Sequence, residues 1–388
     1  MEKIKTSGYI EKYPSQMGTI FVIGTLYKIF GTTNYRLIQY INIFSNLITF
    51  LFMYLILKKL EKNYKVSKVA YGIMCLTFIP LILLSTYVYG DYIGMALSVV
   101  GIYFAMDYKE KGNIVRLLIS AVFMCLSYIT KMNYVIVILA ILIYFGLYLL
   151  QDIEEKNKKK ITKSIFGMVV FILIALMPFS LIKSYCNKKY GYEKEQSIPT
   201  SVWIYLGMNE SYRANGWYSN LAGEAWEDTP LSHTTYPQKI KVRVKDFIKH
   251  PGYTFKFYWK KTVSGWMDPY FQSIWYNVGV ENKDKIMYDI MNTKKYKVGE
   301  IYQKALTILI YVGAFVAIIK NRKNLNNELT LLFTIFIGGF MFHTIWEMKS
   351  RYTLPYVIML IPISAIGIEY IVEKMKNPKI KKLNKENV

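Results

Sequence analysis

Residues 37–57 read LIQYINIFSNLITFLFMYLIL, an apolar run without a single charge that ends directly at Lys58-Lys59. A helix of about 20 such residues crosses the roughly 30 Å apolar core of a bilayer. Comparable apolar segments recur along the chain, so the sequence predicts an all-α polytopic membrane protein with about nine transmembrane helices. The expected spans are 36–57, 67–87, 91–108, 114–130, 132–150, 161–183, 302–319, 328–345 and 352–372.

The basic residues alternate from one side of these spans to the other. Of 388 residues, 49 are Lys or Arg and 26 are Asp or Glu, which gives a formal net charge of +23. Most of the excess lies in loops 58–68, 109–116, 151–163 and 320–323 and in the tail, whereas the opposite short loops carry few cations. By the positive-inside rule, the basic loops and the C-terminus are cytoplasmic. The charge therefore reflects topology in the cell membrane, and nucleic-acid binding is not expected.

The spans divide the chain into five expected regions. Residues 1–35 form an outer-face segment, 36–183 a bundle of six helices, 184–300 a mixed extracytoplasmic domain, 301–373 a bundle of three helices, and 374–388 a basic cytoplasmic tail. Within the extracytoplasmic domain, residues 246–258 and 282–291 are modest helix candidates. The three cysteines fall in or beside different spans, so they suggest no disulfide.

The beginning of the chain departs from this pattern. Residues 17–30 are apolar but reach only about 21 Å as a helix, which is too short to span. Span 36–57 must start outside to place Lys58 in the cytoplasm, so residues 14–30 are expected to form an interfacial helix on the outer face that ends at Phe30-Gly31. We expect that a preceding transmembrane helix and part of an outer loop are missing. The alternative is that span 36–57 inserts unaided.

Candidate chemistry gathers at the outer ends of the spans, since no phosphate loop, nucleophile motif or metal motif occurs. Asp91 opens a span after Gly90, although it could simply cap a helix. Lys131 lies between two spans, although it could snorkel to the interface. Residues 346–352 and 11–16 add further charges at the same membrane level. This shared depth indicates one site for a ligand with an anionic head and an apolar tail.

The extracytoplasmic domain contains residue types that suit a sugar. Trp203 and Asn209 stand in one short stretch, and Trp217 follows in the next. Aromatic faces pack on the C–H faces of sugars, and amides bind hydroxyl groups. An interfacial aromatic belt or a small domain core is the alternative reading.

Taken in order, these motifs resemble a known class. Tyr13-Pro14 before an apolar run that ends at Phe30-Gly31, then Gly90-Asp91, Thr130-Lys131 and Arg351-Tyr352 with Pro355, are similar to the GT-C class of membrane glycosyltransferases. More closely, they resemble bacterial relatives of the protein O-mannosyltransferases and of lipid A aminoarabinose transferase. The resemblance covers most of residues 11–372, and the individual motifs are short.

The resemblance implies a donor sugar on polyprenyl phosphate and transfer on the outer face to a glycan, lipid or protein acceptor. It implies that Lys12, Lys131 and Arg351 bind the donor phosphate and that Asp91 is catalytic, orienting the acceptor or a divalent metal. The family's usual catalytic base lies before the start of this chain, and Glu11 is the nearest acid. Further expected contacts with sugar or acceptor come from Glu347 and Tyr352, besides the domain residues named above.

The reaction that we predict is therefore glycosyl transfer from a polyprenyl-phosphate sugar to a cell-surface acceptor, in contact with membrane lipids. No cofactor motif is present, and a divalent metal stays open. Two other functions remain: a transporter or flippase for a lipid-linked saccharide, and a non-catalytic GT-C relative that binds lipid-linked sugar. Charge-free span interiors and the absence of a visible repeat weigh against the transporter.

Overall fold

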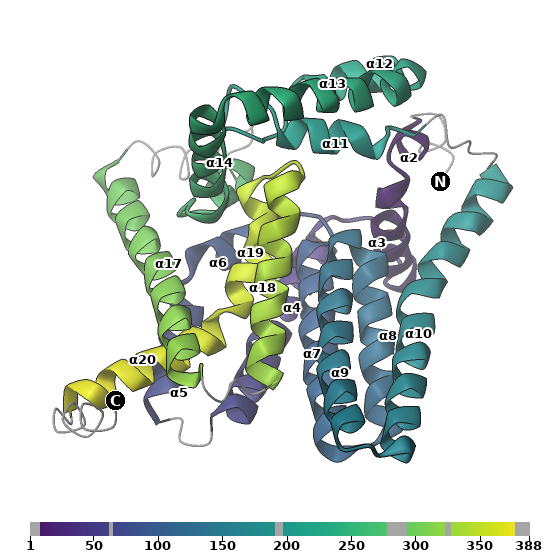
Figure 1. Cartoon of the computed structure of the whole chain (residues 1–388). Coiled ribbons are helices and arrows are strands. Elements are labelled where there is room, and N and C mark those ends of the chain that lie inside the picture. Colours follow the sequence, from purple (N-terminus) through teal and green to yellow (C-terminus); the bar gives the residue numbers. More distant parts are fainter. Residues whose placement is uncertain (1–7, 62–64, 191–196, 278–292, 323–326, 377–388) are drawn as a thin grey trace.

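The computed structural model describes residues 8–61, 65–190, 197–277, 293–322 and 327–376, and every regular element in them is a helix (Figure 1). The bundle contains α4 Arg36–Leu60, α5 Lys65–Thr77, α6 Ile79–Leu84, α7 Asp91–Lys111, α8 Ile114–Thr130, η2 Met132–Tyr134, α9 Val135–Glu154, α10 Lys158–Tyr190, α17 Lys294–Asn321, α18 Asn327–Ile345, α19 Ser350–Met359 and α20 Ile361–Lys376. One end of the bundle is covered by α11 Thr200–Gly207, α12 Leu221–Glu227, α13 Thr229–Lys249, α14 Pro251–Trp266 and α15 Ser273–Asn277. We call the end of the bundle that these helices cover the domain end, and we call the opposite end the loop end.

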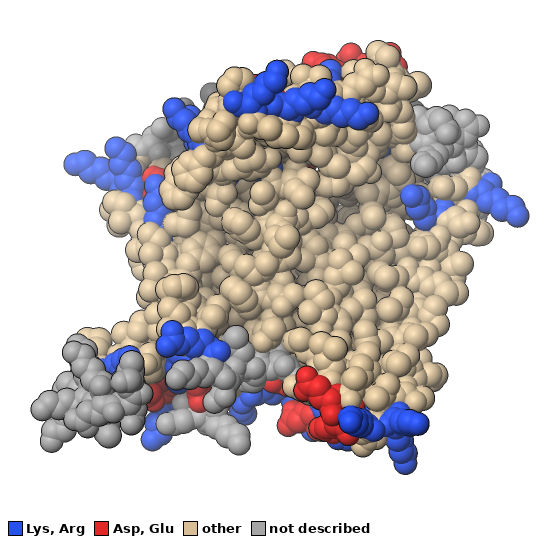
Figure 2. Space-filling view, in the orientation of Figure 1, with Lys and Arg blue, Asp and Glu red and all other residues tan. Residues whose placement is uncertain are grey.

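The predicted all-α polytopic membrane fold is confirmed. Among the described residues, five helices are long and apolar enough to cross a membrane, or six if the bent pair α19–α20 is one span. The other expected spans correspond to α5–α6, α7 and α8, which are broken, largely buried or short. Figure 2 shows Lys, Arg, Asp and Glu gathered at the two ends of the molecule, with a charge-free belt between them. This distribution fits a bilayer around the belt.

Two expected spans are interrupted, and proline explains both breaks. Span 67–87 is split at Phe78, and Pro80 stands at the start of α6. Span 352–372 bends by 52° between α19 and α20, where Pro362 follows the break. Proline has no N–H to donate and clashes with the preceding turn, so the helix restarts there. At the first break, the side-chain amide of Gln303 donates to the Thr77 carbonyl at 2.8 Å, which satisfies one freed acceptor.

Small residues set the closest helix approaches in the bundle. A Cβ on Gly367 of α20 would lie 1.9 Å from the carbonyl oxygen of Gly313 on α17, so only glycine allows these backbones to touch. Polar side chains add specific links: Asn42 of α4 donates to the carbonyls of Ser85 and Tyr87 at 3.0 and 2.9 Å. These bonds hold the loop after α6 against α4, just before α7 begins.

The segment before α4 contains the expected short helix. It comprises α2 Tyr9–Lys12, η1 Pro14–Gln16 and α3 Met17–Ile29, and the chain turns at Gly31 with φ 62°. Only the first turn of α3 is buried, where Gly18 contacts the backbone of α8 and Thr19 donates to the Thr130 carbonyl at 2.7 Å. Several apolar side chains beyond that turn are exposed, which suits contact with lipid.

The domain is built on α11, which lies between α13 and the bundle (Figure 1). Val202, Leu206 and Tyr236 are the centre of its small apolar core. The expected helix at 246–258 is wrong as one element, because α13 ends at Lys249 and Pro251 starts α14 after His250. The candidate at 282–291 lies outside the described residues. Helix α10 runs on to Tyr190 and α17 starts at Lys294, so helices reach past the expected domain limits of 184 and 300.

Candidate active site

Asp91 is the first residue of α7 and the centre of a buried charge cluster at the domain end. Its carboxylate forms an ion pair with Lys131 and another with Arg351, the latter at 3.3 Å. Gly90 makes this possible, because a Cβ there would meet the Thr130 carbonyl oxygen at 2.6 Å. Neither Asp91 carboxylate oxygen accepts a hydrogen bond from the described residues, so the side chain does not cap the helix. The capping alternative therefore does not describe its role here.

Lys131 follows the last residue of α8 and turns inward instead of toward solvent. Its side chain is 11% exposed. The ammonium lies 5.4 Å from the ring centre of Tyr89 and 5.0 Å from that of Tyr352. Lys131 therefore does not snorkel to the membrane interface, because its ammonium faces Asp91 and two aromatic rings.

Arg351, the second residue of α19, is surrounded by tyrosine. Four rings lie within 4.4–5.2 Å of its guanidinium carbon, those of Tyr87, Tyr89, Tyr276 and Tyr352. The tyrosine faces stabilise a desolvated cation without neutralising it. Sequence reasoning missed the first three of these tyrosines. Only the pattern Tyr87-Val-Tyr89 directly before Gly90-Asp91 could have indicated two of them.

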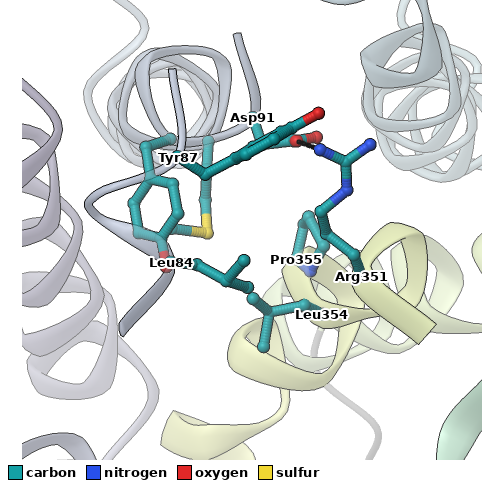
Figure 3. A pocket seen from close by; sticks show the side chains of 8 residues that line it. Leu84, Tyr87, Asp91, Arg351, Leu354 and Pro355 are labelled. Atoms are coloured by element: carbon teal, nitrogen blue, oxygen red, sulfur yellow. Dashed lines mark ion pairs between the residues drawn. The ribbon is translucent and has the colours of Figure 1, made fainter. Parts of the chain in front are cut away.

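A small cavity adjoins this cluster (Figure 3). Figure 3 shows Asp91 and Arg351 joined by their ion pair in the wall of this cavity. It measures about 10 Å³, the space of about one water molecule, so a larger ligand enters only if side chains move. One part of the wall is charged and another is apolar, as an amphiphilic ligand would require. The lining residues are Leu84, Tyr87, Asp91, Tyr92, Met95, Arg351, Leu354 and Pro355.

A second buried acid lies beside the first cluster, in the turn between α18 and α19. Glu347 is 4% exposed, and its Oε1 accepts no hydrogen bond from the residues that the structure describes. The nearest cation is the Lys349 ammonium at 3.6 Å. Burial raises the pKa of Glu347, and Lys349 and Arg351 oppose the rise. Tyr352 links the two clusters, because Lys131, Lys349 and Arg351 all lie within 5.7 Å of its ring centre.

Lys261 holds this turn in place, and sequence reasoning missed it entirely. Its side chain is buried in α14 and donates to three carbonyls, those of Gly207, Thr344 and Trp346, at 2.7, 2.9 and 2.9 Å. The first ends α11 and the other two end α18, so one ammonium serves two helix C-termini. Burial lowers the pKa of Lys261 to about 7. One lysine thus fixes the domain to the turn that carries Glu347.

The structure brings Asp91, Lys131, Arg351, Glu347 and Tyr352 together, and it places the other predicted residues around them. The Lys12 ammonium donates to the Thr229 hydroxyl, at the start of α13. The carbonyl of Trp203 accepts from the Glu347 backbone N–H at 2.9 Å. The amide of Asn209 donates to the Tyr205 carbonyl, and the buried Trp217 indole donates to Ser264. These last two polar groups serve the domain's own structure.

In the part of the chain that the structure describes, no group of three or more His, Cys, Asp and Glu side chains converges as metal ligands. Asp91 is already engaged by two cations, and a metal ion would have to displace at least one of them.

One known family matches part of the chain. Residues 17–182 match the model of the dolichyl-phosphate-mannose-protein mannosyltransferase family. The matched part includes Asp91 and Lys131 and is consistent with the GT-C class of glycosyltransferases. It supports a membrane glycosyltransferase that uses a lipid-linked sugar. No curated protein matches the chain.

Proposed function

We propose that the chain transfers a sugar from a polyprenyl-phosphate donor to a cell-surface acceptor at the domain end, and that this end faces outside. The observation that carries the proposal is the buried cluster of Asp91, Lys131 and Arg351. One carboxylate there faces two cations, so positive charge is in excess beside an apolar wall. A phosphate monoester or diester on a long hydrocarbon chain matches both features.

The reaction breaks the bond between the sugar C1 and the phosphate oxygen, and the electron pair leaves with the phosphate. The acceptor's hydroxyl oxygen forms the new bond to C1 and gives up its proton. Negative charge grows on the leaving phosphate, so fixed cations that face it lower the barrier most. Arg351 and Lys131 have this role in our proposal. The four tyrosine rings around Arg351, which we call the tyrosine box, keep the guanidinium oriented and dehydrated before the donor arrives.

Glu347 is the acid that we assign to the acceptor's proton. Asp91 is a weaker candidate, because both its oxygens face cations. Like the two Asp91 oxygens, Glu347 Oε1 accepts no hydrogen bond from the described residues, but it faces a single cation, the Lys349 ammonium at 3.6 Å, and burial raises the pKa of Glu347. A carboxylate with a raised pKa is a stronger base. Asp91 then acts as the residue that positions Lys131 and Arg351.

The test uses purified protein in detergent with synthetic polyprenyl phosphate, and polyprenyl alcohol as the uncharged comparison. We expect wild-type protein to bind the phosphate and not the alcohol, and Arg351→Ala to lose both phosphate binding and sugar transfer. Arg116→Ala is the matched control, because Arg116 pairs with Asp107 at 3.0 Å near the loop end. Equal phosphate binding by wild type and Arg351→Ala would remove Arg351 from the proposed site.

The same purified protein also distinguishes glycosyl transfer from the two other functions, transport of a lipid-linked saccharide and binding without catalysis. Vesicles that contain the protein and a labelled polyprenyl-phosphate sugar report transfer and transbilayer movement at once. Movement of the label without transfer would identify a transporter, and binding without either would identify a non-catalytic relative. Transfer that depends on Arg351 is the result that the proposal requires.

A further inference from the structure

The domain carries a strongly basic helix on the side that should need no positive charge. Helix α13 contains five cations and one acid: Lys239, Lys241, Arg243, Lys245, Lys249 and Asp246. Cations in loops at the loop end follow from the positive-inside rule, but that rule does not call for any at the domain end. Figure 2 shows a row of Lys and Arg over the top of the molecule, where α13 lies in Figure 1. They require a different explanation.

An open groove runs along this helix. It is an open hollow between one face of α13 and Tyr205 of α11, with a volume of about 480 Å³. The contributing positions on α13 follow helical spacing from Thr235 to Asp246, about 16 Å along the helix axis. A groove of this length accommodates several sugar units in line. Its walls carry a hydroxyl, an amide, cations, an acid and an aromatic ring, contributed by Tyr205, Thr235, Gln238, Lys239, Val242, Arg243 and Asp246.

The two cations in the groove differ in how they are held. Arg243 is part of the framework, because it donates to the Met208 carbonyl at 2.9 Å and pairs with Asp246 at 2.7 Å. Lys239 forms no ion pair among the described residues, and its ammonium lies over the rings of Tyr205 and Tyr236 at 5.7 and 4.8 Å. It is therefore a positive charge that is positioned by aromatic rings and open to an anionic partner.

The groove also connects to the candidate active site through one short helix. Tyr205 lines the groove, and Trp203, two residues earlier on α11, accepts the hydrogen bond from the Glu347 backbone. Helix α13 lies beyond α11, away from the bundle (Figure 1). Lipid headgroups at the domain end of the spans would meet the bundle before they reach this groove. A partner in the aqueous phase fits the position better than a membrane surface does.

We propose that this groove binds a linear, negatively charged saccharide chain. Aromatic and amide groups recognise the sugar rings, and Lys239 recognises a phosphodiester or carboxylate on the chain. Resting on the proposed function, the bound chain is the acceptor, held by the domain while its end reaches Glu347. The binding itself does not depend on transfer and can be measured alone.

The experiment measures binding of three chains of matched length to purified protein in detergent: poly(glycerol phosphate), oligogalacturonate and neutral dextran. We expect at least one anionic chain to bind and dextran to bind at least tenfold more weakly. The first two probes separate phosphodiester from carboxylate recognition. Lys239→Gln should weaken anionic binding roughly fivefold to tenfold, as loss of one charge-assisted contact does. Lys241→Gln removes the same charge from an exposed position of α13 outside the groove and should have little effect.

If Lys239→Gln and Lys241→Gln weakened binding of the anionic chain equally, the proposed groove site would be refuted. That result would indicate that the chain binds to the general positive charge of the surface. Dextran binding as tightly as the anionic chains, or competition by anionic phospholipid vesicles at equal charge, would also refute the groove site. Arg351→Ala separates this inference from the proposed function. That variant should bind the anionic chain normally while it fails to transfer sugar. Normal transfer by Arg351→Ala would refute the proposed donor site and leave the groove standing.

Discussion

Replacing Lys261 by methionine tests how the domain is joined to the bundle. Methionine keeps the volume and the apolar character of the buried chain but donates no hydrogen bond. The carbonyls of Gly207, Thr344 and Trp346 then lose their shared donor. An orphaned buried acceptor costs about 1–3 kcal/mol, and water can reach some of them, so we expect a loss of about 3 kcal/mol in total. For a chain of 388 residues, whose unfolding entropy is about 0.8 kcal/mol/K, that corresponds to a fall in Tm of roughly 4 °C.

Thermal stability in detergent, followed by size-exclusion chromatography after heating, measures this loss. Lys260→Met is the matched control, because Lys260 is the exposed neighbour on the same helix. The pH dependence provides a second reading of the same contact. Burial lowers the pKa of Lys261 to about 7, and an unfolded lysine titrates near about 10.4. Between these values the unfolded chain holds more protons, so stability from this group rises with pH.

The difference in free energy of unfolding between wild type and Lys261→Met should therefore widen from pH 7 to pH 9. The full contribution of the Lys261 pKa shift to that difference is on the order of 4 kcal/mol. Sugar transfer should fall too, because Lys261 positions the turn that carries Glu347. Equal melting temperatures for Lys261→Met and Lys260→Met would refute the claim that these hydrogen bonds join the domain to the bundle. A gap that does not change with pH would refute the assignment of a lowered pKa to Lys261.

Further predictions concern the proton acceptor Glu347, the acid Asp107 near the loop end, and the helix crossing at Gly367. Glu347→Gln should reduce kcat about 10²–10⁴-fold and leave polyprenyl-phosphate binding intact; loss of binding instead would make it a ligand contact. Asp107→Asn removes the acid that pairs with Lys59, Lys111 and Arg116, of which Lys59 keeps Glu110. Because these cations are partly exposed, the change should cost about 1–2 kcal/mol, with unchanged transfer per folded molecule. Gly367→Val should lower the yield of folded protein sharply, because its side chain meets the Gly313 backbone; normal yield would contradict that packing.

The fold class could be predicted from the sequence because its causes are local. The length of an apolar run decides whether a helix can span a bilayer, and residues 37–57 carry that information by themselves. The net charge of each loop can likewise be counted from the residues of that loop alone. The helix after Tyr13-Pro14 and its end at Gly31 were predictable for the same reason. The breaks at Phe78 and Leu360 were less so, because a proline in a membrane helix can also be tolerated by its neighbours.

The candidate site could be predicted in part. Asp91, Lys131 and Arg351 were singled out because each lies at the same end of a span, and alternating span direction places such residues at one depth. The sequence could not show that Asp91 pairs with both cations, since Arg351 is 260 residues away and the pairing depends on how α19 packs. The tyrosine box around Arg351 is hidden for the same reason. Its members come from the loop before α7, from α15 and from α19.

What the sequence determined alone is therefore the set of helices, their apolar lengths and the depth at which charges lie. Tertiary structure alone decided which charges meet and which polar groups are used for packing. It turned Lys131 inward, paired the amide of Asn209 with a backbone carbonyl, and placed Lys261 at two helix C-termini. The physical reason is that burial of a charge depends on every neighbour at once. Hydropathy is a sum over adjacent residues, whereas an ion pair requires two backbones to be brought within a few ångströms by the whole bundle.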